Sequence, residues 1–140
     1  MNVNFSVELR GLEQGEQETL AKSKRALFLG MSKMHEIAIM RCPADTGDLR
    51  NSIWLHPDWP GEVEYLLTVG LDYGIHVEYG TSPHFVPISP LKSWSRRVLG
   101  DEKAAYAVRA AISKRGTPAQ PFLRPAFDEV VNIHMKKYLK

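Results

Sequence analysis

Two short motifs contain residue types that can do catalytic or metal chemistry. Asp45-Thr46-Gly47 is the tripeptide of aspartic proteases, which use two carboxylates sharing one proton on loops supported by strands. His76-Val77-Glu78 has the His-x-Glu spacing of zinc deaminases, which also need a Pro-Cys-x-x-Cys ligand pair. The chain has one cysteine, Cys42, and the aspartate motif follows a helical pattern rather than an apolar strand. The sequence therefore predicts no catalytic residue, no metal and no cofactor.

The same residues have structural interpretations. We expect Asp45 or Thr46 to cap a short helical turn, with Gly47 relaxing the backbone. His76 and Glu78 would share one face of a strand as a hydrogen-bonded pair. Glu78 lies among apolar neighbours, so a buried carboxylate there needs a partner. Arg50 and Arg124 are the two candidates because each guanidinium can bind a carboxylate through two hydrogen bonds.

Charge is distributed unevenly along the chain. Eighteen Lys and Arg against 16 Asp and Glu give a net charge of +2. Residues 1–70 contain seven basic and ten acidic residues, net −3, whereas residues 71–140 contain eleven and six, net +5. Much of the excess lies between Lys92 and Arg115. Two interpretations stay open: a solvated helical face, or a basic patch that meets nucleic acid or an acidic protein surface.

Length and composition indicate what kind of fold must position these residues. A chain of 140 residues, 44% hydrophobic and 24% charged, is typical of one globular domain spanning 1–140. The first ten residues lack a secretory signal pattern, and no run approaches the roughly 20 apolar residues of a membrane span. We therefore expect synthesis and folding in cytoplasm, with no membrane contact.

Alternating apolar residues predict strands in the first half of the chain. Val3–Leu9 alternates cleanly, Ile53 and Leu55 follow a turn, and Val63–Val69 alternates again. Ile75, Val77 and Tyr79 predict a further strand. Short turns between these segments favour antiparallel pairing.

Helical spacing predicts a long first helix. Apolar residues recur every three or four positions from about Glu16 to Arg41, where Pro43 ends the pattern. Gly30 marks either a kink or a close backbone contact. Phe28 and Ile37 widen the apolar stripe, which indicates a surface for a neighbouring subunit as well as for the sheet.

Further helices are predicted in the last third. Ser89 is the expected cap of one helix that ends at Gly100, and Asp101 of a second that ends at Gly116. Pro125 is expected to open the C-terminal helix. The predicted fold class is α+β: an antiparallel sheet packed by a long N-terminal helix and a C-terminal helix, with an inserted helical pair at about 85–115.

Three segments together resemble the tail-completion, or head–tail joining, proteins of tailed bacteriophages. Pro43–Ile53 resembles their Pro-x-Asp-Thr-Gly-x-Leu-x-x-Ser-Ile signature after the first helix. Val77–Thr81 is similar to a strand ending in Glu-aromatic-Gly-Thr, and Ala119–Phe127 to the Pro-Phe-Leu-Arg-Pro-Ala segment before the C-terminal helix. The segment 85–115 departs from the many members that run more directly from Gly-Thr to Pro-Phe.

The resemblance implies a non-enzymatic structural virion protein at the neck or upper tail end. Its implied partners are copies of itself in a ring, the connector or stopper, and the tail-tube and tail-terminator proteins, with DNA only as passing cargo. Its implied location is the virion, and the host cytoplasm during assembly. The motif positions, expected to be fold determinants, are Asp45, Thr46, Gly47, Leu49, Arg50, Ser52, Glu78, Tyr79, Gly80, Thr81, Pro121, Phe122, Arg124 and Pro125.

We expect the acidic half of one subunit to face the basic half of the next. The candidate subunit interface comprises Phe28, Ile37, Arg96, Arg97 and Arg109. Gly80 is expected to let the chain turn after the strand, and Thr81 to hydrogen-bond locally. Two alternative functions stay open: a small nucleic-acid-binding protein using the basic 92–115 helices, and an aspartic-type hydrolase around Asp45.

Overall fold

The described part of the chain, residues 2–6, 17–56 and 64–139 of a computed structural model, has an α+β fold. The strands are β1 (Asn2–Ser6), β2 (Ile53–His56) and β3 (Glu64–Val69). The helices are α1 (Gln17–Arg41), α2 (Asp48–Asn51), α3 (Gly74–Tyr79), α4 (Ile88–Val98), α5 (Ala104–Arg115), α6 (Leu123–Glu129), the π-helical η1 (Val130–His134) and α7 (Met135–Tyr138). This confirms the predicted fold class, including the inserted helical pair.

The three strands form one antiparallel sheet in the order β1-β3-β2. Phe5 pairs with Tyr65, and Ile53 pairs with Val69. The strands predicted around Ile53–Leu55 and up to Val69 are confirmed, and β1 covers the start of the predicted N-terminal strand. Residues 7–9 and 63 of those predictions lie outside the described part of the chain.

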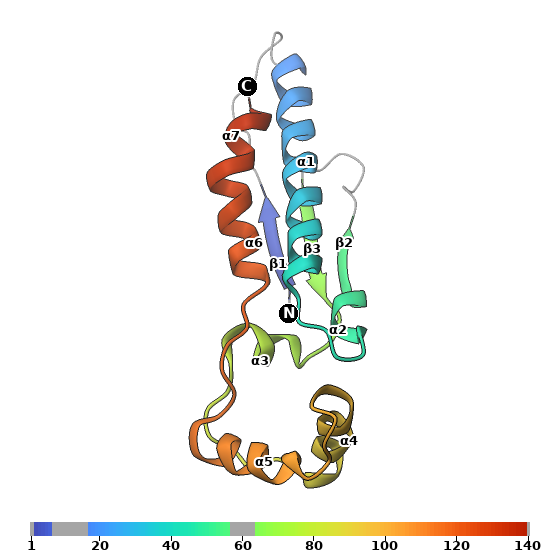
Figure 1. Ribbon diagram of the computed structural model, residues 1–140. Helices are drawn as coiled ribbons and strands as arrows, with labels where there is room; N and C mark the ends of the chain where they lie inside the picture. The colour runs from blue at the N-terminus through green and yellow to red at the C-terminus, as the bar shows by residue number, and fades with distance from the viewer. Residues whose placement is uncertain (1, 7–16, 57–63, 140) are drawn as a thin grey trace.

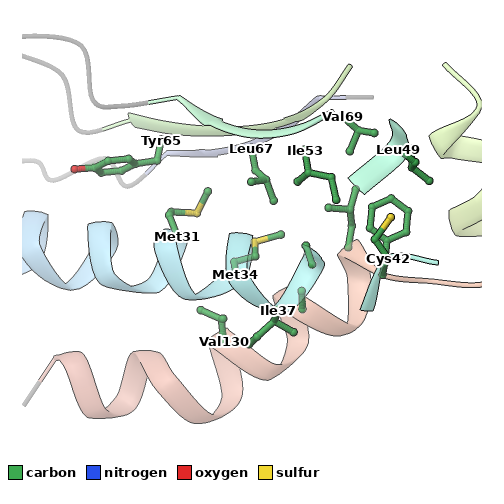
Figure 2. Packing of buried hydrophobic residues seen from close by; sticks show 14 of the residues in the cluster. Met31, Met34, Ile37, Cys42, Leu49, Ile53, Tyr65, Leu67, Val69 and Val130 are labelled. Atoms are coloured by element: carbon green, nitrogen blue, oxygen red, sulfur yellow. The ribbon is translucent and has the colours of Figure 1, made fainter. Parts of the chain in front are cut away.

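The hydrophobic core lies between this sheet and two long helical segments. α1 runs along the sheet, and α6, η1 and α7 form a second rod beside it (Figure 1). Met31 and Met34 point from α1 toward Leu67 of the sheet, and Val130 approaches from the second rod (Figure 2). Burying a large apolar side chain stabilises a fold by about 1.5–3 kcal/mol, so this cluster dominates the stability of the body.

Gly30 is a close-contact position, one of its two predicted roles. α1 continues through Gly30, which is buried. A Cβ atom at Gly30 would lie 2.5 Å from the sulfur of Met135, so the glycine lets the C-terminal rod approach α1 closely.

Phe28 and Ile37, both expected at a subunit interface, lie in different environments. Ile37 is 6% exposed and belongs to the core, so the expectation that it contacts a neighbour is wrong. Phe28 is 48% exposed, and its ring centroid lies 5.9 Å from that of Tyr65. Ile37 lies beside Val130, on the face of α1 that packs against the C-terminal rod (Figure 2), so α1 uses this face for its own core.

This difference predicts unequal effects of two substitutions. Ile37→Ala should destabilise the fold by about 2–4 kcal/mol because it removes buried methyl groups and leaves a cavity. Phe28→Ala should cost about 1 kcal/mol or less because the ring is half in solvent. Urea unfolding of both variants measures the two costs, and equal losses would contradict this account of α1.

The strand predicted at Ile75–Tyr79 is wrong, because these residues form α3. Alternation of apolar and polar residues over five positions also fits one and a half helical turns. Gly74 is buried, and a Cβ there would lie 2.8 Å from Val69, so the chain turns tightly against the end of β3. The helix leaves Ile75 and Tyr79 exposed and turns Glu78 inward.

The helix starts in the last third differ from the predicted caps. α4 begins at Ile88, after Pro87, so Ser89 lies inside the first turn rather than at the cap. α6 begins at Leu123, two residues before Pro125. Proline is tolerated in a first turn, where the missing N–H has no intrahelical acceptor. Asp101 does accept the Lys103 N–H at 2.8 Å in the turn that leads into α5.

Candidate functional site

Glu78 is a buried carboxylate of the body, defined here as the described residues outside 80–121. Its side chain is 3% exposed. Oε2 accepts the backbone N–H groups of Phe122 at 2.8 Å and Leu123 at 2.9 Å, and Oε1 accepts that of Arg124 at 2.9 Å. These are the N–H groups that a helix start leaves without intrahelical acceptors. Glu78 therefore caps α6 from a segment more than 40 residues away in the chain.

The predicted guanidinium partner of Glu78 is wrong, although its burial is confirmed. Arg124 contributes its backbone N–H, and its side chain is exposed. Arg50 Nη2 instead donates to the carbonyl of Cys42 at 2.9 Å, which joins α2 to the end of α1. Charged residues can be identified in the sequence, but the backbone N–H groups that a helix start leaves without acceptors cannot. In the fold, these N–H groups bind the Glu78 carboxylate in place of a guanidinium.

The Asp45-Thr46-Gly47 loop leads into α2. Gly47, with φ of 90°, is itself the N-cap of α2, so the prediction that it relaxes the backbone is confirmed. No side chain among the described residues caps this helix, so the predicted cap by Asp45 or Thr46 is wrong. The Thr46 hydroxyl donates to the carboxylate of Asp48 at 2.5 Å. Leu49 is buried in the core, and the Ser52 hydroxyl donates to its carbonyl at 2.8 Å. The motif thus fixes the corner between α1 and β2.

The carboxylate of Asp45 pairs with the guanidinium of Arg97 on α4. Arg97 Nε donates to Oδ1 at 3.0 Å and Nη2 to Oδ2 at 2.6 Å, a two-bond pairing. The side chains are 48% and 30% exposed for Arg97 and Asp45. A proton-sharing carboxylate pair needs a second acid close by, whereas Asp45 binds a permanent cation. This geometry favours a structural role for Asp45 over hydrolytic chemistry.

The pairing should be visible in the titration of Asp45. The hydrogen bonds from Arg97 lower the pKa of the Asp45 carboxyl below its ordinary value of 3.8. Because the folded pKa is lowered, the contribution of the pair is present above pH 3.8 and is lost as pH falls through the lowered pKa. NMR titration should show the pKa of Asp45 rising in Arg97→Met, and an unchanged value would show that the pair does not form in solution.

Residues 80–84 and 116–121, here called the waist, link the body to residues 85–115, here called the hairpin (Figure 1). The Thr81 N–H donates to the Thr117 carbonyl at 3.1 Å, and the Thr117 N–H donates to Thr81 Oγ1 at 3.0 Å. Their hydroxyl oxygens lie 2.9 Å apart. Gly80 and Gly116 have φ of 74° and 73°, so each Gly-Thr pair supplies both a turn and a crossing contact.

The waist contains residues whose contacts the sequence patterns do not predict. The sequence predicts Gly116 only as a helix stop, and Thr81 only as a local hydrogen-bonding residue. A Cβ at Gly116 would lie 1.8 Å from the carbonyl oxygen of Thr81, so the glycine is required by the crossing. The repeated dipeptide, Gly80-Thr81 and Gly116-Thr117, was the available signal.

An open cleft of about 640 Å³ lies between the body and the hairpin. The Asp45 loop and α3 form its body side, and Trp94 and Val98 of α4 form part of its other side. His76 lines this cleft and is exposed, while Glu78 is buried, so the predicted pairing of these two residues is wrong. Helical geometry puts positions two apart on different faces.

The three arginines expected at a subunit interface each have a partner within the chain. Arg96 pairs with Glu102, and Arg97 with Asp45. The Arg109 guanidinium lies 5.3 Å from the ring centroid of Phe85. These contacts are exposed, so they organise the hairpin surface at little energetic gain.

The charge asymmetry separates the hairpin from the rest of the chain, not one sequence half from the other. Residues 85–115 contain seven Lys and Arg against two Asp and Glu, a net charge of +5. The remaining residues must then carry −3 to give the total of +2. The two sequence halves are interleaved in space because α1 and the C-terminal rod lie side by side.

Comparisons with family models, curated proteins and solved structures give no match. Within the described residues, no group of three or more His, Cys, Asp or Glu side chains is arranged to hold a metal ion. The same residues include no helix that is long and apolar enough to cross a membrane.

Proposed function

We propose that the chain is a tail-completion or head–tail joining protein of a tailed bacteriophage. It acts as a ring of copies at the neck or upper tail end, in contact with connector, stopper, tail-tube or terminator proteins. It works in the virion after assembly in the host cytoplasm, and DNA passes through the ring. The proposal rests on the resemblance in three segments of the sequence and on how these segments meet in the fold.

The observation that carries this proposal is the meeting of all three segments at one end of the body. Glu78 of the second segment binds the backbone of Phe122, Leu123 and Arg124 in the third. The loop at Asp45 in the first segment lines the same cleft as residues of the other two. Three chance matches, each more than 20 residues from the next, have no reason to converge in this way.

Surface charge and exposed apolar residues support assembly. The hairpin carries net +5 and the rest of the chain −3, so different surfaces of two copies attract. Contacts between unlike surfaces are heterologous, and such contacts close into rings when the rotation allows. Phe28, Trp54 and Phe85 are exposed and add apolar area for neighbouring subunits.

Nucleic-acid binding by the hairpin is the second candidate because of the same net charge of +5. Arg96, Arg97 and Arg109 are each engaged within the chain, which favours a protein surface over a row of phosphate-binding side chains. Retention on duplex DNA that falls steeply with salt, with a slope of several units, would favour this candidate.

Light scattering tests the proposed function. We expect the protein to form an oligomer larger than a dimer, alone at low salt or upon adding a tail-tube protein. Reversing the charge of Arg96, Arg97 and Arg109 together should lower the measured mass at low salt, and the difference should shrink as salt screens the charges. A monomer under all these conditions would contradict the proposal.

A further inference from the structure

The hairpin is attached to the body by little besides the waist. α4 and α5 pack mainly on each other, and no extensive packing joins either to a described helix or strand of the body. Few hairpin side chains are buried, among them Leu91, Ser95 and Ala105. A two-helix layer with so little interior has one face that needs a partner.

Large apolar residues remain exposed on the hairpin. Phe85 is 73% exposed, and Val98, Leu99 and Tyr106 are each about half exposed. The cleft leaves about 640 Å³ open between the hairpin and the body of the same chain. The hairpin therefore retains apolar surface that contacts within its own chain do not cover.

One ion pair spans this cleft. Arg97 and Asp45 are joined by two hydrogen bonds, but both side chains are substantially exposed to solvent. A pair this exposed holds the hairpin weakly, and an identical pair between two copies forms with the same geometry. The Arg97–Asp45 pair that an exchange of the hairpin breaks within one chain is thus regained between two copies.

We propose that, in the ring, the hairpin of one copy lies against the body of the next and that Arg97 binds Asp45 of that next copy. This inference rests on the proposed function and names its subunit contact. The net charge of +5 on the hairpin and −3 on the rest of the chain selects a second copy as the occupant. The hairpin and the Asp45 loop are different surfaces, so the contact is heterologous and suits a ring.

The waist permits this exchange because it contains no helix or strand. Residues 80–84 and 116–121 have no regular secondary structure and lie between α3 and α4 and between α5 and α6. Gly80 and Gly116 provide the positive φ angles at which each segment leaves its helix. A change of direction at these two points moves the hairpin while α1, the sheet and α6 keep their packing.

Mixing of charge-reversed variants tests the exchange. Asp45→Arg and Arg97→Asp should each weaken assembly roughly tenfold because like charges then face each other across every contact. An equimolar mixture should recover the wild-type mass, because Arg97 of the first variant meets Asp45 of the second and the two introduced side chains also have opposite charges. The double variant D45R/R97D should assemble by itself. Circular dichroism verifies that each variant is folded.

Arg96→Asp is the matched control because Arg96 lies beside Arg97 on α4 and pairs with Glu102 inside the hairpin. Arg96→Asp should assemble by itself, and its mixture with Asp45→Arg should show no assembly beyond that of Arg96→Asp alone. If the double variant assembles and the mixture of single variants does not, the pair forms within one chain and the exchange is overturned. Single variants that assemble normally, or that lose only retention on duplex DNA, also overturn it.

The same experiment separates the two proposals. If the wild-type protein forms rings but the mixed variants do not recover assembly, only the exchange of the hairpin is contradicted. A wild-type protein that stays monomeric with and without the tail-tube protein contradicts the proposed function, and the exchange falls with it.

Discussion

Replacing Glu78 with alanine should lower the free energy of unfolding by about 3–5 kcal/mol, a large share of the stability of a domain this size. The carboxylate accepts three backbone N–H groups at the start of α6, and two of these hydrogen bonds are buried. Alanine leaves the donors unsatisfied away from water and opens a cavity beside Phe122, which is fully buried. Urea unfolding followed by circular dichroism measures the loss.

Two further variants separate the cap from general effects. Glu78→Gln keeps the shape but removes the charge and turns an amide donor toward one N–H, so we expect a cost of about 1.5–3 kcal/mol. Glu36→Ala is the surface control, because Glu36 is exposed and pairs with Lys33 within α1, and its cost should stay below about 0.5 kcal/mol. A loss in Glu78→Ala no larger than that of Glu36→Ala would refute the capping role.

Gly116→Ala should produce the second large effect. The added Cβ would lie 1.8 Å from the Thr81 carbonyl oxygen, and the residue has φ of 73°, a region that L-residues with a Cβ rarely adopt. The two waist segments must separate, which breaks the hydrogen bonds between Thr81 and Thr117. We expect a loss of roughly 2–4 kcal/mol and faster hydrogen exchange at both threonine amides.

Gly100→Ala is the matched control for this substitution. Gly100 has a similar φ of 72°, but a Cβ there would meet no atom within 4 Å. Its cost should therefore reflect backbone conformation alone, about 1–2 kcal/mol. If Gly116→Ala and Gly100→Ala cost the same, close approach at the waist is not the reason for Gly116.

The elements that could be predicted from the sequence are those with a long apolar pattern or with two independent signals. α1 repeats its apolar stripe along its whole length, and Pro43 marks its end, so the sequence predicts its bounds almost to the residue. α3 has six residues, and over that length the alternation at Ile75, Val77 and Tyr79 fits a strand as well as a helix. The close approach of Gly74 to Val69 and Leu49 decides the outcome, and this approach is tertiary.

The candidate site was predictable in its residues but not in its contacts. Glu78, Gly80 and Thr81 stand out in the sequence, and each has a defined structural role. Their partners lie about 36 to 46 residues away and include backbone N–H groups, which no side-chain pattern reveals. The same holds for Asp45 and Arg97, which are 52 residues apart and have different predicted roles.

Electron microscopy of the purified oligomer, alone or bound to the tail-tube protein, tests the central claim most directly. We expect closed rings of identical copies with an open central channel and with each hairpin against the neighbouring body. Uniform monomers, or open chains without a channel in both conditions, would contradict it.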